Sequence, residues 1–156
     1  ESFKPGRPVL EAIRDLVERI YKDFKYDPGF STISTPLHTV MKHRRGVCQD
    51  FAHLAIACIR ATGLAAGYVS GYLETLPPPG QEKLEGADAS HAWFAVYMLD
   101  YGWMHFDPTN NMLASDQHIT LAFGRDFADV TPLKGVIYGG DDHELKVSVD
   151  VRRIEE

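Results

Sequence analysis

The chain of 156 residues lacks a long apolar run, has only two cysteines, and has fewer basic than acidic side chains. No apolar run approaches the roughly 18 residues that a membrane-spanning helix needs, and no charged-then-apolar leader typical of a signal peptide opens the sequence. The 16 Lys and Arg against 22 Asp and Glu give a net charge of −6. This balance argues against nucleic acid or an anionic membrane surface as the main partner.

The two cysteines, Cys48 and Cys58, both fall in a stretch that is predicted to be helical. Their positions on one helix put the Cα atoms about 15 Å apart, whereas a disulfide needs them within about 7 Å. These two thiols therefore cannot pair within that helix. Free thiols are typical of a reducing compartment, and together with the lack of a leader they predict a cytoplasmic protein.

Length and composition predict a single globular domain over residues 1–156. The apolar share of 44% and the charged share of 24% are ordinary for a globular protein. A domain of this size buries about 70% of the surface of its unfolded chain, so it needs no metal or cross-link for stability. The first residue is Glu1 rather than Met, and we expect the domain to be cut from a longer chain.

Helices are predicted in the first part of the chain. Residues 8–25 place apolar side chains at helical spacing, with charged residues on the other side. The stretch from Thr35 to His43 predicts a shorter helix with Thr35 as its cap. Residues 48–62, which Gly63 ends, are apolar on almost all sides, and this is typical of a helix buried on most of its faces.

After these helices the pattern changes to that of β-strands. Strands are predicted at residues 68–73, 91–98, 103–107, 118–123 and 136–151. Residues 76–90 contain three prolines and two glycines and predict a surface loop. Helices that come first and antiparallel strands that follow indicate an α+β domain with a mostly antiparallel sheet.

Cys48 is predicted to lie in the first turn of the buried helix. A helix N-terminus offers unpaired N–H groups and a partial positive charge, and this setting favours the thiolate, which is the reactive form of the side chain. Cys58 lies among mid-helix apolar residues and is interpreted as a small core residue.

His91 begins a predicted strand, and Asp107 ends the strand that returns beside it. A turn centred on Leu99 would place them directly opposite each other, and a turn centred on Asp100 would make them diagonal neighbours. Either arrangement puts both on one face, about 5 to 8 Å apart, whereas a turn centred between two residues would separate them onto opposite faces. A thiol nucleophile needs a base and the base needs an orienting acceptor, so Cys48, His91 and Asp107 are the candidate catalytic residues.

Three segments resemble the transglutaminase-like core of the papain-related thiol enzymes, and most closely its bacterial branch of transglutaminase-like cysteine proteases. They are Gly46-Val47-Cys48-Gln49-Asp50-Phe51-Ala52, Ser90-His91-Ala92-Trp93 and Gly102-Trp103-Met104-His105-Phe106-Asp107-Pro108-Thr109. Two later segments are similar to the same branch: His118-Ile119-Thr120 and Gly124-Arg125-Asp126-Phe127-Ala128-Asp129-Val130. The resemblance extends over most of the chain.

The resemblance implies a papain-like fold in which Cys48 starts a central helix packed on an antiparallel β-sheet, and a triad of Cys48, His91 and Asp107. It implies a thiol hydrolase that cleaves amide or peptide bonds through a thioester acyl-enzyme. We expect a peptide, a protein or another amide as the substrate, and no cofactor. Two alternatives stay open: a transglutaminase that transfers the acyl group to an amine, and a non-catalytic peptide-binding or scaffolding domain on the same fold.

The resemblance also implies an oxyanion hole beside the nucleophile. The backbone N–H of Cys48 is one candidate donor, and Tyr26 is the candidate for the second because no Trp precedes Cys48. Gln49, Trp93 and Trp103 are candidates for lining a substrate groove, with packing as the alternative for both tryptophans.

No metal site is predicted. The spacing of His43, Cys48 and His53 matches no usual set of zinc ligands, and on a helix the side chains of Cys48 and His53 would point about 140° apart. Asp50, in the first turn of the same helix, is interpreted as a cap for the exposed N–H groups.

Overall fold

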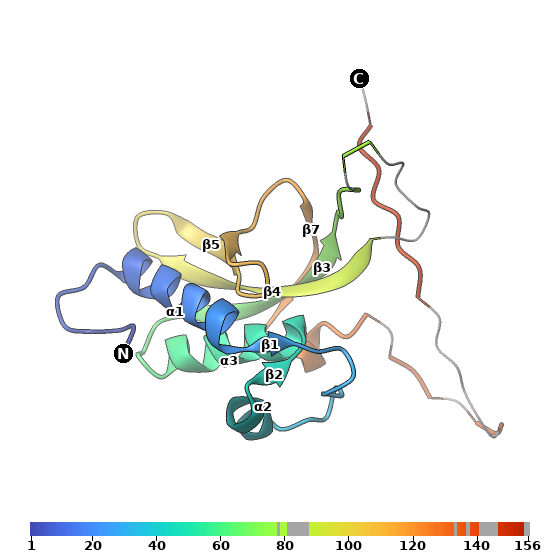
Figure 1. The fold of residues 1–156 in the computed structure, drawn as a ribbon, viewed down its shortest axis with the longest axis horizontal. Helices are drawn as coiled ribbons and strands as arrows, with labels where there is room; N and C mark the ends of the chain where they lie inside the picture. The colour runs from blue at the N-terminus through green and yellow to red at the C-terminus, as the bar shows by residue number, and fades with distance from the viewer. Residues whose placement is uncertain (78, 81–87, 133, 137, 141–146, 155–156) are drawn as a thin grey trace.

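A computed structural model describes residues 1–77, 79–80, 88–132, 134–136, 138–140 and 147–154 of the chain. A five-stranded antiparallel sheet, in the order β6-β5-β4-β3-β7, forms one layer, and helices cover one of its faces (Figure 1). This arrangement confirms the predicted α+β class. In the part of the chain that the structure describes, no helix combines the length and the hydropathy that crossing a membrane requires.

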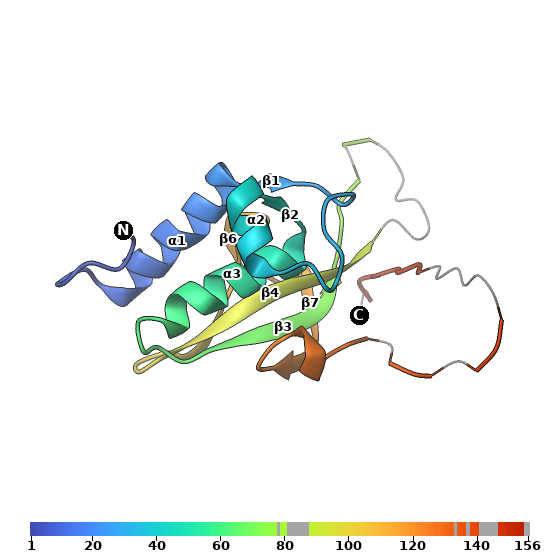
Figure 2. The same cartoon turned by 90° about the horizontal axis from the view of Figure 1, so that it is seen from below.

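Three α-helices precede the sheet: α1 (Val9–Asp23), α2 (Leu37–His43) and α3 (Cys48–Arg60). The apolar side of α1 packs in the main core together with α3 and the inner face of the sheet. Helix α2 packs against α3, as Figure 2 shows from below. Helix α3 therefore lies at the centre of the helical layer, which is why its sequence is apolar on almost every side.

The sheet is built from β3 (Ala66–Leu73), β4 (Ala89–Met98), β5 (Gly102–Asp107), β6 (Met112–Leu113) and β7 (His118–Gly124). Alternation along the strands divides their side chains between two faces. Tyr68, Phe94 and Phe106 belong to the main core beneath the helices, whereas Val69 and Trp93 form a smaller apolar cluster that is separate from the main core.

A short parallel pair lies outside the main sheet and was not predicted from the sequence. Strand β1 (Lys25–Tyr26) pairs with β2 (Arg45–Gly46), and Tyr26 is the partner of Gly46. Because Gly46 precedes α3 by two residues, this pairing places Tyr26 beside the start of that helix.

Two sequence predictions are wrong. Thr35 does not cap α2, whose N-cap is Pro36 and which has no side-chain cap bond; the hydroxyl of Thr35 instead accepts the backbone N–H of Thr32 at 2.8 Å and closes the preceding turn. The predicted strand 136–151 falls partly outside the described residues. In its described part only Val149 pairs, in a single bridge with Asp88, because an alternating pattern defines a face but provides no neighbouring strand.

The predicted loop 76–90 also lies mostly outside the described residues, and β4 begins within its last two positions, at Ala89.

Strand β7 contains a β-bulge opposite β3. Ser70 pairs with Ala122, but the next residue, Gly71, pairs with Thr120, so that Leu121 is the extra residue. A one-residue shift of register reverses the face to which the following side chains point. The side chains of the first three residues of β7 therefore point to the faces opposite to those that an unbroken alternation would give them.

Gly71 is the point at which the bulge approaches β3 most closely, and we predict that it tolerates no side chain. A Cβ there would lie 2.1 Å from the carbonyl oxygen of Ile119 and 2.6 Å from the ring of Trp93. Gly71→Ala is expected to lower the free energy of unfolding by about 2 kcal/mol or more, measured by urea denaturation. Gly67→Ala in the same strand is the matched control, because its nearest contact is 3.3 Å, to Gly124. Equal losses in both variants would contradict the prediction.

Candidate active site

Cys48 is the first residue of α3, and a buried carboxylate fixes the start of that helix. The Oδ2 atom of Asp50 accepts the backbone N–H of Val47 at 2.8 Å and the hydroxyl of Ser31 at 2.5 Å. Gly46 allows this approach, since a Cβ there would lie 2.7 Å from the same oxygen. The interpretation of Asp50 as a cap is confirmed, and it positions the half-buried thiol of Cys48 at the end of the helix.

The two cysteines are both free, as expected. Cys58 packs against the main core, and burial raises the pKa of its thiol. This environment confirms its interpretation as a core residue and leaves Cys48 as the thiol at the site.

The hairpin of β4 and β5 brings His91 and Asp107 together. Phe94 pairs with Phe106, so the turn is centred on Asp100 and the two site residues are diagonal neighbours. The His91 Nε2 donates to the Asp107 Oδ2 at 2.8 Å. Of the registers that the sequence left open, the structure has one that keeps both side chains on the same face.

The His91 ring also interacts with the thiol. Burial opposes a charge on this ring, but hydrogen bonds with Asp107 and with Cys48 outweigh it and raise the pKa of His91 to about 9. The raised pKa favours the protonated form of the ring, and Asp107 and Cys48 are the two groups that stabilise it.

Asp107 is fully buried, with 0% of its surface exposed, and every lone pair has a donor within reach. Its Oδ1 accepts the backbone N–H groups of Thr109 and Asn110 at 2.9 and 3.2 Å. Its Oδ2 accepts from the Asn110 side chain at 2.7 Å, from His91, and from the His118 Nε2 at 3.1 Å. Burial alone would raise its pKa, but the hydrogen bonds from His118 and His91 hold the pKa of Asp107 well below its usual range.

His118 is the site residue to which sequence reasoning assigned no role. It belongs to a segment that resembles the bacterial branch, but strand spacing alone could not place it beside Asp107. The bulge in β7 decides where it points, and no turn residue or other signal in that stretch marks a bulge.

Trp93 is completely buried, so its candidacy as a wall of the substrate groove is wrong and the packing alternative is confirmed. Its ring centroid lies 5.9 Å from that of His91 and 5.1 Å from that of His118. Its indole N–H donates to the Nδ1 of His105 at 3.2 Å. The ring of Trp93 thus packs against both histidines of the site.

Trp103 is exposed but lies away from the site. It pairs with Tyr97 at the far end of β5, four residues and thus about 13 Å from Asp107 along the strand. With Ala95 and Phe123 it lines a different cavity of about 420 Å³, to which neither Cys48 nor His91 contributes.

Gln49 and Tyr26 both lie near the nucleophile. Gln49 lines a cavity of about 420 Å³ that extends along α3 as far as Arg60, and neither Cys48 nor His91 lines it. Burial and the charge of Cys48 raise the pKa of Tyr26, which shows that its hydroxyl lies within electrostatic reach of the sulfur.

The ligand-type atoms of His91, Asp107 and His118 lie within 4.8 Å of one another, close enough to be considered as a metal site. The backbone N–H of Ser115, however, donates to the Nδ1 of His118 at 3.1 Å. A neutral His118 therefore bears its proton on Nε2, the atom that a metal would need, whereas a metal-bound imidazole donates from its other nitrogen. The donor set fits a hydrogen-bond network better than a metal centre.

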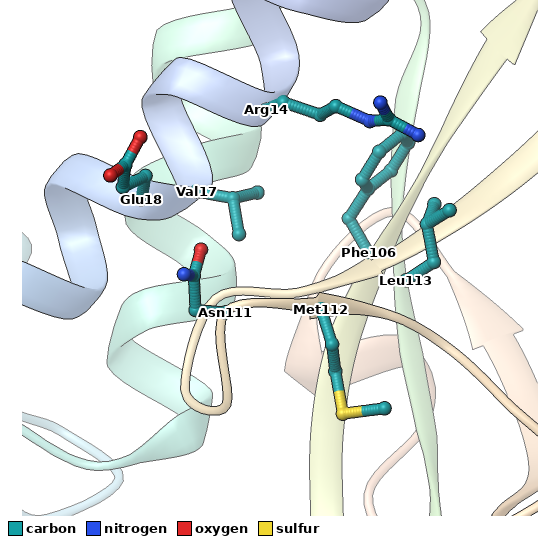
Figure 3. A pocket seen from close by; sticks show the side chains of 7 residues that line it. All are labelled: Arg14, Val17, Glu18, Phe106, Asn111, Met112 and Leu113. Carbon is teal, nitrogen blue, oxygen red and sulfur yellow. The ribbon is translucent and has the colours of Figure 1, made fainter.

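A separate cavity of about 300 Å³ lies between α1 and the β5–β6 region (Figure 3). Its lining residues are Arg14, Val17 and Glu18 from α1, with Phe106, Asn111, Met112 and Leu113 from the facing strands and turn. Neither the thiol nor the two histidines contribute to it, so it is distinct from the site around Cys48.

A family model described as the Transglutaminase-like superfamily matches residues 2–108, a range that contains Cys48, His91 and Asp107. The chain belongs to the transglutaminase-like superfamily. Among its relatives is the uncharacterized protein Rv2569c of Mycobacterium tuberculosis, which is 52% identical over 155 residues; the match covers 96% of this chain and 49% of the relative. This transglutaminase-like chain thus spans about half the length of its mycobacterial relatives.

Two solved structures extend the comparison. A Cytophaga hutchinsonii protein described as a "Putative Cysteine Protease" aligns with a TM-score of 0.69 and 32% identity, over 83% of this chain and 41% of the other. The periplasmic domain of TgpA from Pseudomonas aeruginosa aligns with a TM-score of 0.52 and 23% identity, over 67% of this chain and 38% of the other, and shows the fold alone. These neighbours confirm the papain-like transglutaminase-core fold.

Because the pKa of His91 is raised in the folded state, we predict that this transglutaminase-like domain loses stability in alkaline solution. The folded value of about 9 exceeds an unfolded value of about 6.5, so the stabilisation is complete below pH 6.5 and is lost as the pH rises through 9. We expect the free energy of unfolding of the wild type, relative to His91→Gln, to fall by roughly 3 kcal/mol across this window. Urea denaturation at several pH values measures it, and a constant difference would contradict the prediction.

Proposed function

We propose that the chain is a thiol hydrolase that cleaves amide bonds of peptides or proteins through a thioester on Cys48. One observation carries the proposal: the His91 Nε2 hydrogen-bonds with the buried carboxylate of Asp107 at 2.8 Å, and Cys48 is close enough to the same ring to raise its pKa. Covalent acyl chemistry needs a nucleophile next to a base, and an acceptor that orients the base.

In the proposed first step the imidazolium of His91 stabilises the thiolate of Cys48. The thiolate attacks the amide carbonyl carbon and forms a carbon–sulfur bond. His91 then donates its proton to the amide nitrogen, the carbon–nitrogen bond breaks, and an amine leaves. Asp107 keeps the ring oriented throughout this transfer.

In the proposed second step the now neutral His91 takes a proton from water. The resulting hydroxide attacks the thioester, the carbon–sulfur bond breaks, and a carboxylic acid leaves. The thiolate of Cys48 and the imidazolium of His91 are thereby restored.

The oxyanion of both steps needs hydrogen-bond donors. The backbone N–H of Cys48 is available for this role, because the first N–H groups of a helix have no partner within it. Tyr26 is the proposed second donor, since the charge of Cys48 contributes to raising the pKa of its hydroxyl. The cavity that Gln49 lines is the proposed place for the substrate chain beyond the reacting amide, because Gln49 directly follows Cys48 in the sequence whereas neither Cys48 nor His91 lines the cavity.

Selective alkylation tests the proposed chemistry. At pH 6 we expect iodoacetamide to label Cys48 at least about tenfold faster than an ordinary thiol, because only a thiolate reacts. Peptide mapping by mass spectrometry measures the label, and Cys58 serves as the internal control in the same sample. His91→Ala is expected to abolish the preference. Equal inertness of both thiols in the wild type would instead support the non-catalytic scaffold.

Tyr26→Phe tests the oxyanion role. Loss of one donor costs about 3 kcal/mol in such sites, so we expect turnover of the best substrate in a fluorogenic peptide library to fall about 100-fold. The alkylation rate of Cys48 should stay unchanged, because that reaction forms no oxyanion. Tyr21→Phe is the control, since Tyr21 lies exposed on α1. Full turnover in Tyr26→Phe would remove this residue from the site.

A transglutaminase is the second candidate, and one relative favours it. A Pseudomonas aeruginosa protein named "Protein-glutamine gamma-glutamyltransferase" is 28% identical over 123 residues, which cover 67% of this chain and 18% of that protein. In that reaction an amine replaces water in the second step. Adding a primary amine to the turnover assay separates the two, because a transferase converts the acyl-enzyme mainly to the new amide and a hydrolase mainly to the acid.

A further inference from the structure

We propose that His118 is a positioning residue that holds Asp107, and through it the His91 ring, in the orientation that acyl chemistry at Cys48 requires. This inference rests on the proposed function. It concerns a residue with no assigned role, whose Nε2 lies 3.1 Å from the same carboxylate oxygen that accepts from His91.

The bulge in β7 is what aims His118 at the site. His91 pairs with Gly71 and His118 pairs with Leu73, on the two strands that flank β3. Alternation puts Gly71 and Leu73 on the same face of β3, so both histidines project to that face. If the pairing of Ser70 with Ala122 continued without the extra residue, His118 would lie opposite Glu74 and point to the other face.

The tautomer of His118 is set by its second nitrogen. The backbone N–H of Ser115 donates to Nδ1, so the proton of the neutral ring is on Nε2 and is donated to Asp107. The ring is also held from the side, because its centroid lies 5.1 Å from that of Trp93 in an edge-on arrangement at 81°. His118 is therefore a fixed donor and not a freely rotating side chain.

Replacing His118 would remove one of the donors to the Oδ2 atom of Asp107. Oδ2 of Asp107 lies between the two imidazoles, and the carboxylate is completely buried. Without the donor on the β7 side, a buried acceptor loses a partner that water cannot easily replace. The four donors that remain come from β4 and from the turn after β5, so the carboxylate is no longer held on the β7 side and the orientation of the His91 ring is less fixed.

The test is the pH profile of Cys48 alkylation by iodoacetamide, with Cys58 as the internal control. His118→Phe keeps an aromatic ring and removes the donor. We expect the acidic limb of its pH–rate profile to move up by about one pH unit, which lowers the labelling rate at pH 6 about tenfold because the thiolate fraction falls. His118→Gln places an amide N–H near the position of Nε2, and we expect it to recover most of the rate. His105→Phe is the matched control, because His105 contacts Trp93 but donates nothing to Asp107.

Each other outcome overturns the inference. A wild-type profile in His118→Phe, with fast labelling of Cys48, leaves the proposed function standing and removes the positioning role. Equal losses in His118→Phe, His118→Gln and His105→Phe, with thermal denaturation as the check on folding, indicate a packing role only. Stoichiometric metal in the purified wild type that His118→Phe removes indicates a metal ligand. Slow labelling of Cys48 in the wild type contradicts both the proposed function and this inference.

Discussion

The buried carboxylate of Asp107 organises this site. Removing the charge of Asp107 from water is costly unless donors replace the solvent, and the chain meets that cost from three separate segments. The turn that follows β5 supplies Thr109 and Asn110, β4 supplies His91, and β7 supplies His118. The hairpin register, the turn and the bulge are all consistent with this single requirement.

A second buried carboxylate, that of Asp50, lies at the start of α3 beside Cys48. Asp50 accepts the N–H of Val47 and so fixes the residue at which α3 begins. One acid thus positions the thiol of Cys48 and the other positions the ring of His91. The core that joins α3 to the inner face of the sheet ties these two positions together, so that the distance from sulfur to imidazole depends on the packing of that core.

Two of the wrong predictions share one physical origin, and the third has another. Alternation in a strand shows that the strand has two faces, but it does not show which face is covered. For this reason Trp93 was a candidate for lining a substrate groove, although the structure buries it fully. Likewise, the alternating stretch 136–151 specifies a face without specifying a partner strand, and a strand exists only where another backbone pairs with it. Thr35 has the side chain of a cap, but a competing turn with Thr32 uses its hydroxyl.

Spacing along the chain was enough to predict the α+β class and the helix that begins at Cys48, and the resemblance of three segments indicated the family. Two of the three hairpin registers left open put His91 and Asp107 on one face, because a short turn governs that pairing. Long-range contacts were needed to place His118 beside Asp107, to bury Trp93 and to bring Tyr26 to the start of α3. Those depend on a bulge, on which sheet face is covered, and on a two-residue parallel pairing. Each is a long-range contact whose register no local pattern specifies.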